Sequence, residues 1–416
     1  MATALDLSSS DIQQLCLKYL QANAQPSSFE IVDSNLKRTS DAPEGYLGSH
    51  FHLQVTLKLQ QCDELKTIRF FCKAAPEGNA SRMQYIEDFG VFQREITAYK
   101  HVLPDLQAAC AEIAPKCYYA DKNLLIFENL IDQGYRMGAG RDGLLNYGQL
   151  HCALKTLAAL HAGSIIMHLQ GKERIPLEEH AYPSNVRKEH MRIRYFYQTC
   201  EVFKELIKTL PKYQSQLDYI LSEVTQRMAI IFELCKASKT RLNVTLHGDL
   251  WANNILFQYD KYDEKPLQCR FVDFQLLRYA PPAMDLTTML TIPTTRQFRA
   301  AHLNELLAEY YRFMKEYLKE ANLNIANILP EAEYYKSMEE YRIVGIIESL
   351  QFSHLAMLPP ACTQELTSSE DGFNDFFSHK RIEICVKAFK SDELYRNRMT
   401  DMLEDFVDNY VLKPTK

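Results

Sequence analysis

The periodicity of apolar residues changes along this chain, and that change constrains the fold more than any other feature. Residues 50–59 alternate apolar and polar side chains, which predicts a half-buried strand. Residues 65–75 predict a second strand after a polar turn at 61–64, and we expect the two to pair antiparallel. From about Asn146 onward the apolar residues recur at helical spacing. The chain should therefore begin with a sheet and continue mostly as helices.

Several further elements follow from the same patterns. A first amphipathic helix is expected after Ser10, and the apolar stripe between residues 83 and 103 predicts one helix with Glu95 at the edge of its buried face. Asn146 is the expected cap of a helix that contains His161. Shorter strands are predicted at 29–32, 117–120 and 124–127, and later helices near 185–208, 212–238, 296–321, 333–357 and 392–411. Residues 358–379 are interpreted as a long connection, with a lid over the substrate as the alternative.

The size of the chain favours more than one lobe. At 416 residues it exceeds the usual size of a single domain. A polar, glycine-containing connection runs from residue 129 to 146, and we place the boundary at its start. The predicted domains are an N-terminal lobe at 1–129 and a C-terminal lobe at 130–416.

Charge and cysteine usage restrict the partners and the compartment. The net charge of −6 gives no overall positive field, which argues against nucleic acid or an anionic membrane as a partner. The eleven cysteines are scattered and never spaced as Cys-x-x-Cys, which disfavours a disulfide framework and a structural zinc site. The N-terminus lacks the pattern of a secretory signal, and no apolar stretch of about 18 residues is evident. We expect a cytoplasmic protein, monomeric or weakly dimeric.

One constellation of polar residues carries the chemistry. Asp249 lies two residues after His247, Asn254 lies five residues after Asp249, and Asp273 ends a later apolar run. Residues 254–259 and 268–273 are expected to form an antiparallel hairpin, which would bring Asn254 beside Asp273. Phosphoryl transfer needs a carboxylate to orient a hydroxyl, and an amide and a carboxylate to hold Mg²⁺ on the phosphates. We therefore predict that Asp249 is the catalytic base and that Asn254 and Asp273 bind the metal.

Four other residues receive less specific interpretations. His247 is expected to organise the loop by hydrogen bonding. Trp251 could line a substrate pocket or anchor the loop in the core. Asp285 is read mainly as a helix N-cap, with a brace of the catalytic loop as the second possibility. His161 is expected to be a core histidine and not a ligand.

The first lobe should supply the groups that hold a nucleotide. Lys73 at the end of the second strand is the predicted phosphate clamp, and Glu95 its ion-pair partner. Gly48 and Ser49 close a turn at residues 43–49 whose backbone N–H groups could approach phosphates, although two glycines in that turn are weak evidence. Adenine is expected to meet the backbone at Glu128 and Leu130, two residues placed at the start of the connection between the lobes.

These segments resemble the ecdysteroid kinase-like family of arthropods, within the choline kinase and aminoglycoside phosphotransferase superfamily. The Asp273-Phe-Gln triplet and the Trp251 that follows His-Gly-Asp-Leu are typical of this family and not of protein kinases. The segments that carry the resemblance are residues 70–73, 92–95, 125–130, 246–256, 272–275 and 278–286. The resemblance implies an α+β, two-lobed protein-kinase-like fold, with a small antiparallel-sheet N-lobe and a larger, mostly helical C-lobe.

The resemblance also implies an ATP- and Mg-dependent kinase that phosphorylates a hydroxyl of a small molecule. Ecdysteroids or similar lipophilic alcohols are the first candidates, and choline-like amines or xenobiotics remain open. Carried across, Asp249 is the base, Asn254 and Asp273 are the metal ligands, and Lys73 clamps the phosphates beside Glu95. Segment 41–49 departs from the tidier pattern of the catalytic loop, which leaves its phosphate contacts open.

Two other classes of function compete with a kinase. A metal-dependent hydrolase could use His247 and Asp249, but it would leave Lys73 and Glu95 without a role and would need more metal ligands than the motif offers. A catalytically silent nucleotide-binding protein would retain the same polar residues. Release of phosphate without an acceptor would indicate the hydrolase, and nucleotide-dependent stabilisation without any product would indicate the silent protein.

Overall fold

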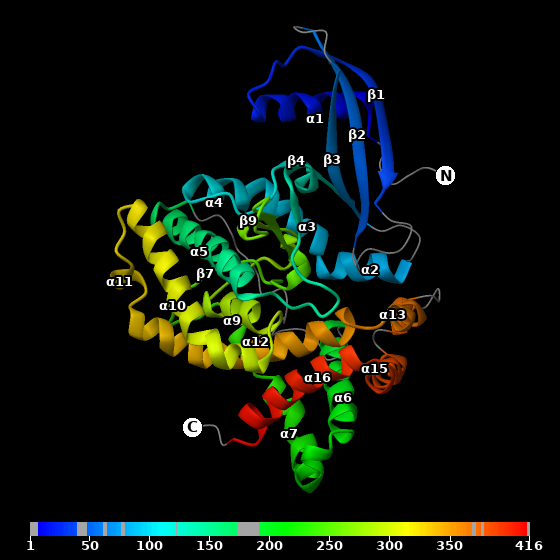
Figure 1. Ribbon diagram of the computed structural model, residues 1–416, viewed down its shortest axis with the longest axis vertical. Helices are drawn as coiled ribbons and strands as arrows, with labels where there is room; N and C mark the ends of the chain where they lie inside the picture. Colours follow the sequence, from blue (N-terminus) through cyan, green and yellow to red (C-terminus); the bar gives the residue numbers. More distant parts are fainter. Residues whose placement is uncertain are drawn as a thin grey trace. The chain divides into compact units, whose positions relative to one another are not determined.

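A computed structural model describes residues 7–39, 48–60, 65–75, 80–121, 123–172, 191–367, 372–375 and 378–413. The chain divides into two compact units, coloured along the sequence in Figure 1. Unit 1 comprises Met1–Pro104 and Ala114–Arg136, and unit 2 comprises Asp105–Ile113 and Met137–Lys416. Each unit has its own buried core.

Unit 1 is built on a five-stranded antiparallel sheet in the order β1-β2-β3-β5-β4. Its strands are β1 (Phe29–Arg38), β2 (Ser49–Leu59), β3 (Leu65–Ala74), β4 (Cys117–Asp121) and β5 (Leu124–Glu128). The alternation predicted for residues 50–59 is confirmed, because the odd-numbered residues of β2 are buried from Phe51 to Leu59. Helix α1 (Ser9–Ala22) packs Leu15, Cys16 and Leu20 into the same core.

Two predictions for unit 1 need correction. The strand expected at 29–32 extends to Arg38, because β1 pairs with β2 as far as the Arg38–Phe51 pair although its outer residues are exposed. The single helix expected between 83 and 103 is wrong: Gly90 adopts a left-handed backbone (φ +56°) that interrupts it. The segment instead forms α2 (Ala80–Phe89), α3 (Val91–Thr97), a π-helical turn η1 (Ala98–Val102) and α4 (Leu103–Ala109). The predicted turn at 61–64 lies outside the described residues.

Unit 2 is mostly helical, as the change of periodicity predicted. Along the chain, η2 (Leu130–Gln133) and β6 (Tyr135–Met137) follow β5 and precede the first long helix. The helices of unit 2 are α5 (Tyr147–Leu169), α6 (Met191–Lys208), α7 (Leu217–Met228), α8 (Ile231–Leu234), α9 (Ala283–Thr291), α10 (Arg296–Glu320), α11 (Ile325–Ile328), α12 (Glu331–Ala356), α13 (Pro360–Thr367), α14 (Gly372–Asp375), α15 (His379–Ser391) and α16 (Glu393–Phe406). Its strands are β7 (Val244–Leu246), β8 (Ile255–Tyr259), β9 (Pro266–Phe271) and β10 (Arg278–Ala280). Single helical turns complete it: η3 (Pro211–Gln216), η4 (Ala252–Asn254), η5 (Phe274–Leu276) and η6 (Val407–Val411).

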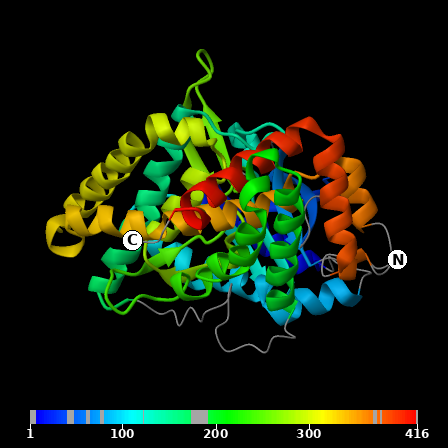
Figure 2. The same ribbon diagram turned by 90° about the horizontal axis from the view of Figure 1, so that it is seen from below.

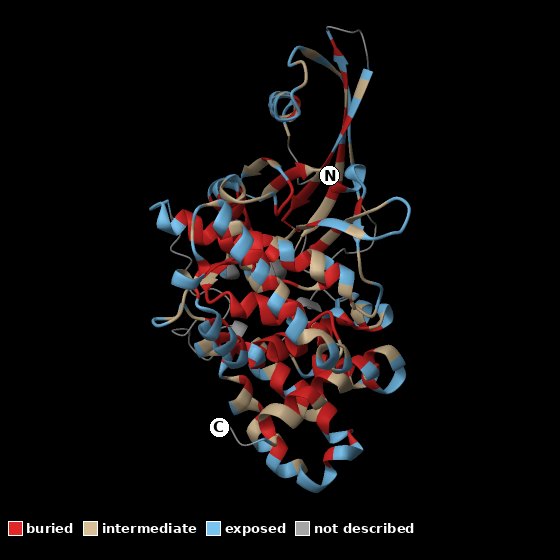
Figure 3. Cartoon of the chain, turned by 60° about the vertical axis from the view of Figure 1, so that its left-hand side comes forward, coloured by how far each residue is buried: buried red, intermediate tan, exposed pale blue. Residues whose placement is uncertain are grey.

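Helix α5 runs through the core of unit 2, against α10 and β9. Asn146 caps it as predicted, in a reciprocal pair of hydrogen bonds with Gln149. The expectation that no stretch is long and apolar enough to span a membrane was wrong, since α5 meets that test by length and composition. However, 83% of its most apolar window is buried inside the structure, as expected of a core helix. Figure 3 colours the chain by burial and shows buried residues along the inner helices and exposed residues along the outer ones.

The C-terminal helices pack around α12, which contacts α9 and α16. In Figure 2 the red α16 crosses the orange α12. Residues 358–379 are not the uninterrupted connection that the sequence suggested, because α13 and α14 lie within them. Leu358, Cys362 and Leu366 recur at a spacing of four and are buried, so this segment has a helical face that packs on the unit.

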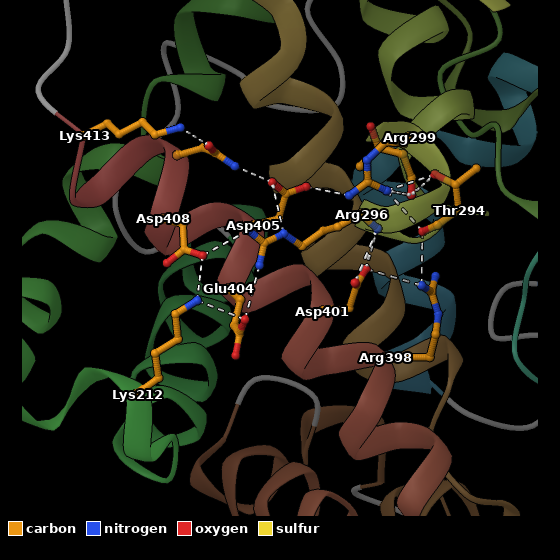
Figure 4. A network of polar contacts seen from close by, with 12 residues as sticks. Lys212, Thr294, Arg296, Arg299, Arg398, Asp401, Glu404, Asp405, Asp408 and Lys413 are labelled. Carbon is orange, nitrogen blue, oxygen red and sulfur yellow. Dashed lines mark hydrogen bonds and ion pairs between the residues drawn. The ribbon is translucent and has the colours of Figure 1, made fainter. Parts of the chain in front are cut away.

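The start of α10 and the length of α16 are joined by a network of charged side chains (Figure 4). Arg299 pairs with Asp405 at 2.5 Å, and Arg296 reaches Asp408 at 3.0 Å. Arg398 of α16 donates to the backbone carbonyls of Ile292 and Thr294 at 2.9 and 3.1 Å. These contacts hold the C-terminal helix against the loop that precedes α10.

Candidate active site

The predicted catalytic loop follows β7, which pairs antiparallel with β10. Gly248 has a left-handed backbone with φ +80°, and a Cβ at this position would lie 2.2 Å from the carbonyl oxygen of Leu276. A side chain at residue 248 would therefore collide with the backbone of the neighbouring segment. The tight approach fixes the direction in which the next residue, Asp249, leaves the strand.

Asp285 of α9 holds this loop through hydrogen bonds to its backbone. Its two carboxylate oxygens accept hydrogen bonds from the backbone N–H groups of His247 at 2.6 Å and Gly248 at 3.0 Å. The N-cap assignment was wrong, because α9 begins at Ala283 and Asp285 lies inside its first turn. The two backbone N–H groups that it accepts from belong to the catalytic loop, where they would be costly to bury without an acceptor. The second reading of Asp285, as a brace of the loop, is the correct one.

Asp285 is itself held by a buried histidine. His161 of α5 lies 3.4 Å from Asp285 through Nε2 and 2.7 Å from the hydroxyl of Tyr310 through Nδ1. Burial alone would raise the pKa of Asp285, but the hydrogen bond and charge of His161, together with His247 and the Gly248 N–H, hold that pKa below its ordinary value. His161 is fully buried, so its prediction as a core histidine is confirmed.

His247 organises the loop as predicted. Its Nδ1 accepts a hydrogen bond from the backbone N–H of Asp249 at 3.2 Å, which leaves Nε2 to donate to the carbonyl of Val272 at 3.0 Å. The two contacts fix the neutral tautomer with the proton on Nε2. They also tie the loop that carries Asp249 to the strand that leads to Asp273.

The predicted hairpin is present and brings Asn254 and Asp273 to the same end. β8 and β9 pair with Ile255 opposite Phe271, and the N–H of Val272 donates to the carbonyl of Asn254 at 3.0 Å. The side-chain nitrogen of Asn254 donates to the backbone carbonyl of Asp249 at 2.8 Å. Asp273 has a left-handed backbone with φ +68°, uncommon for a residue with a side chain and worth roughly 1–3 kcal/mol of strain.

Asp249 is buried with one oxygen unsatisfied. Its exposed fraction is 3%, and Oδ1 has no hydrogen-bond partner among the described residues. Burial raises the pKa of Asp249 well above its ordinary value, the charge of Asp273 raises it further, and contacts from Gln275 and Asn254 oppose the change. An unpaired buried carboxylate oxygen is costly, which is typical of a group reserved for a ligand.

Gln275, the last residue of the Asp273-Phe-Gln triplet, contacts Asp249, whereas Glu348 and Phe352 of α12 were not singled out from the sequence. Gln275 Nε2 lies 3.4 Å from Asp249 Oδ2, and the charge of the buried Glu348 on α12 also acts on the pKa of Asp249. Phe352, one turn after Glu348, stacks on Trp251 with ring centroids 6.5 Å apart. Trp251 is half-buried, so it neither sits in the core nor stands free. The helical spacing of 348 and 352 was the one available signal that both share a face.

The residues present fit a magnesium ion. Mg²⁺ prefers oxygen ligands, keeps several waters and is commonly held by one or two protein carboxylates together with substrate phosphates. The amide of Asn254 is oriented by its bond to Asp249, and the carboxylate of Asp273 leaves the adjoining end of the hairpin. No cluster of three or more His, Cys, Asp or Glu side chains suited to a metal occurs in the part of the chain described here. A site made of one amide and one carboxylate agrees with that finding.

Unit 1 contains the predicted ion pair. Lys73 Nζ lies 2.6 Å from Glu95 Oε2, and both side chains are buried. Glu95 is 1% exposed, so it lies deeper than the edge position expected from the helical pattern. Gly48 adjoins Lys73, since a Cβ at Gly48 would be 3.4 Å from Lys73 Cε, and Ser49 pairs with Ala74 in the sheet. Residues 43–47 of the predicted phosphate turn lie outside the described residues.

The two residues expected to meet adenine lie where β5 ends. The N–H of Glu128 donates to the carbonyl of Lys116 at 3.0 Å, and its carboxylate accepts from the Lys116 N–H and from Gln133. Leu130 is buried and begins the helical turn η2. The backbone N–H of Glu128 is therefore used inside unit 1, and a nucleotide would have to use its carbonyl or the backbone of Leu130.

Comparison with known proteins shows the family to which this chain belongs. The profile of the ecdysteroid kinase-like family matches residues 42–323, which is more than half of the chain. The chain belongs to the ecdysteroid kinase-like family. The matched range includes Lys73, Glu95, Asp249, Asn254 and Asp273. As a member of this family, the chain is a small-molecule kinase.

Comparison with solved structures finds distant similarity. The microcompartment-associated aminopropanol kinase has a TM-score of 0.41 and 11% sequence identity, covering 92% of this chain and 95% of its own. A GDP complex of an aminoglycoside 2′-phosphotransferase mutant has a TM-score of 0.41 and 11% identity, covering 91% of this chain and 99% of its own. A search of curated proteins finds no sequence that matches this chain.

Proposed function

We propose that this kinase uses ATP and Mg²⁺ to transfer the γ-phosphate to a hydroxyl of an ecdysteroid or a similar lipophilic alcohol, in the cytoplasm. The observation that carries the proposal is the convergence on Asp249: a buried carboxylate with an unsatisfied oxygen, bonded through its backbone to Asn254 and next to the charge of Asp273. In phosphoryl transfer such a carboxylate orients the acceptor hydroxyl and accepts its proton.

Each unit has a defined share in this proposal. Unit 1 contains most of the proposed N-lobe at 1–129, but it excludes Asp105–Ile113 and extends to Arg136. In this unit Lys73 holds the nucleotide phosphates and Glu95 keeps its ammonium in place. Gly48, Ser49, Glu128 and Leu130 are the proposed backbone contacts to the nucleotide. A buried Lys–Glu pair fits this task because an unpaired buried charge would be strongly destabilising.

The proposed C-lobe at 130–416 carries the chemistry. Asn254 and Asp273 would hold Mg²⁺, whose charge neutralises the phosphates when it is bound. Asp249 accepts the proton of the acceptor, the role that its buried carboxylate with one unsatisfied oxygen fits. His247 and Asp285 keep the loop in place through backbone contacts and touch no reacting atom.

An aromatic pair on the catalytic loop favours a lipophilic acceptor. Trp251 is two residues after the proposed base and stacks on Phe352 of α12, the helix that also carries Glu348. An acceptor with a rigid apolar body and a hydroxyl at its edge suits that combination. Choline-like amines and xenobiotic alcohols are the alternatives that the same experiment separates.

The test is a screen of the purified chain with ATP, Mg²⁺ and a panel of steroid, amino and xenobiotic alcohols. We expect phosphorylated product from at least one lipophilic alcohol, and a loss of about 10²- to 10⁴-fold in kcat for Asp249→Asn. Binding of a nucleotide analogue should persist in that variant, because the change leaves Lys73 and Glu95 intact. Full turnover by Asp249→Asn would reject the base assignment, and product from an amine alone would reject the lipophilic acceptor.

A further inference from the structure

Two cysteines of unit 2 meet where the core helix packs on the hairpin of the proposed metal site. Cys152 lies in the second turn of α5, and Cys269 lies in β9, opposite Phe257 of β8. The sulfur of Cys269 is 3.1 Å from Thr156 Oγ1 and 3.9 Å from the backbone carbonyl of Cys152. Residues 152 and 156 stand one above the other on the helix, so the Cys269 sulfur sits against the turn that carries the Cys152 side chain.

The two thiols differ in burial and in ease of ionisation. Cys152 is partly exposed, whereas Cys269 is fully buried. A hydrogen bond from the Cys269 thiol lowers the pKa of Cys152 despite burial, and the charge of Lys155 acts in the same direction. Burial raises the pKa of Cys269 well above its ordinary value. Cys152 therefore ionises more readily than Cys269, so it is the sulfur of the pair that attacks an oxidant first. Cys269 can act as the second sulfur because of its position against the turn that carries Cys152.

We propose that Cys152 and Cys269 form a peroxide-sensitive pair that closes to a disulfide between α5 and β9. The Cys152 thiolate attacks one oxygen of hydrogen peroxide, the O–O bond breaks, and hydroxide leaves and is protonated to water. The Cys269 sulfur then attacks the Cys152 sulfenic sulfur, the S–O bond breaks, and the second oxygen leaves as water with the Cys269 proton. In sum, two thiols and one peroxide give one disulfide and two waters.

Closure should disturb the proposed metal site. A disulfide requires the two sulfurs to come within about 2.0 Å, so closure must rotate the two side chains, draw β9 towards α5, or do both. We expect part of the change to fall on β9, because Cys269 is fully buried and has little room to rotate. Asp273 lies two residues beyond the end of β9. The intervening residue, Val272, accepts a hydrogen bond from His247 at its carbonyl and donates its N–H to the carbonyl of Asn254. A misplacement of about 1 Å in such a site can lower the rate on the order of a hundredfold. This consequence for turnover rests on the proposed function, whereas formation of the disulfide does not.

The experiment treats the full-length reduced chain with hydrogen peroxide, blocks the remaining thiols and maps disulfides by peptide mass spectrometry. We expect a peptide pair joined through Cys152 and Cys269 that disappears after dithiothreitol and is absent from Cys152→Ser. Cys110→Ser is the matched control, because Cys110 is also partly exposed but burial raises its pKa to about 12. That variant should form the same linked peptide as the unaltered chain.

Turnover is measured on the same samples. We expect at least a tenfold loss after oxidation, recovery with dithiothreitol, and resistance of Cys152→Ser. A linked peptide with unchanged turnover would reject the coupling to the active site. Oxidation of Cys152 to sulfinic acid with Cys269 still reduced would overturn the pair itself. If no acceptor is ever phosphorylated, the mass measurement still decides the disulfide.

Discussion

Unit 2 contains two polar networks that differ in their exposure to solvent. The loop network joins Tyr310, His161, Asp285 and the backbone of His247 and Gly248, and its side chains are buried. The charged network of α10 and α16 has more ion pairs, but several of its side chains, including Arg296 and Lys212, are partly exposed (Figure 4). The network with more ion pairs is therefore not the one that holds its elements more firmly. Solvent weakens the exposed ion pairs of α10 and α16, whereas the buried hydrogen bonds around Asp285 are not weakened in this way.

The largest effect is expected for Asp285→Ala. The change removes an ionised acceptor from two buried N–H groups, and each such hydrogen bond is worth about 1.5–3 kcal/mol. We expect a stability loss of about 3 kcal/mol or more in urea unfolding, and a loss in kcat that exceeds any change in KM. Tyr310→Phe is the control, since it keeps the ring and removes the outermost hydroxyl. Equal losses in the two variants would show that the network does not act through the loop.

The second prediction concerns Gly248→Ala. The added methyl would meet the Leu276 carbonyl at 2.2 Å, and the backbone angle is unfavourable for alanine. We expect the free energy of unfolding to fall by about 2 kcal/mol or more. Activity should fall even under conditions where the variant is fully folded, because the catalytic loop must shift to make room for the methyl group. Gly171→Ala is the matched control: its φ is +66°, but its Cβ would meet nothing within 4 Å. A stability loss at 248 no greater than at 171 would contradict the collision.

The third prediction uses the pH dependence of a buried group outside both networks. Burial lowers the pKa of His354 to about 3, and the nearby Arg381 guanidinium adds to this. The folded state therefore holds His354 neutral, and the stability it contributes above pH 6.5 is lost as the pH falls towards 3. Unfolding of the unaltered chain should take up about one proton at His354 in this pH range, and His354→Gln should abolish that uptake. The free energy of unfolding of the unaltered chain should therefore change by about 1.4 kcal/mol more per pH unit than that of the variant. Parallel stability curves for the two proteins between pH 4 and 6 would be the contrary outcome.

The smallest effect is expected in the charged network. Asp408 receives hydrogen bonds from Lys212 at 2.7 Å and from Tyr213 at 2.9 Å, yet its side chain is 23% exposed. We expect Asp408→Asn to cost about 1 kcal/mol or less at low salt and nearly nothing at 1 M salt, with kcat unchanged. Thermal melts at both ionic strengths measure this. A salt-independent loss would mean that the exposed network resembles the buried one.

The sequence predicted elements whose pattern is local. Alternation over residues 50–59 identified β2, the turn-forming run before Pro266 identified the β8–β9 hairpin, and Asn146 marked the start of α5. In each case the signal lies within the segment itself or in a neighbour close in the chain, so the local sequence pattern is enough to predict the element. The same reasoning predicted that Asn254 and Asp273 lie at the same end of the hairpin.

Features decided by contacts between distant segments could not be predicted in this way. The role of Asp285 depends on two amides 37 and 38 residues earlier in the chain, and its partner His161 comes from a third segment. An acid inside an otherwise apolar stretch was the available signal, because a buried carboxylate needs partners. The break at Gly90 was missed for a different reason: a single left-handed residue does not alter the helical spacing on either side of it.

Helix α5 gives the proposed chemistry an unexpected dependence on one element. It carries Cys152 near its start and His161 nine residues later, about 13 Å along the axis at 1.5 Å per residue. Both residues belong to one hydrogen-bonded helix, so any part of the closure that displaces α5 at Cys152 would also displace His161 near its middle, which contacts Asp285. Oxidation at Cys152 and the geometry of the catalytic loop would then depend on a single rigid element, without any segment having to unfold.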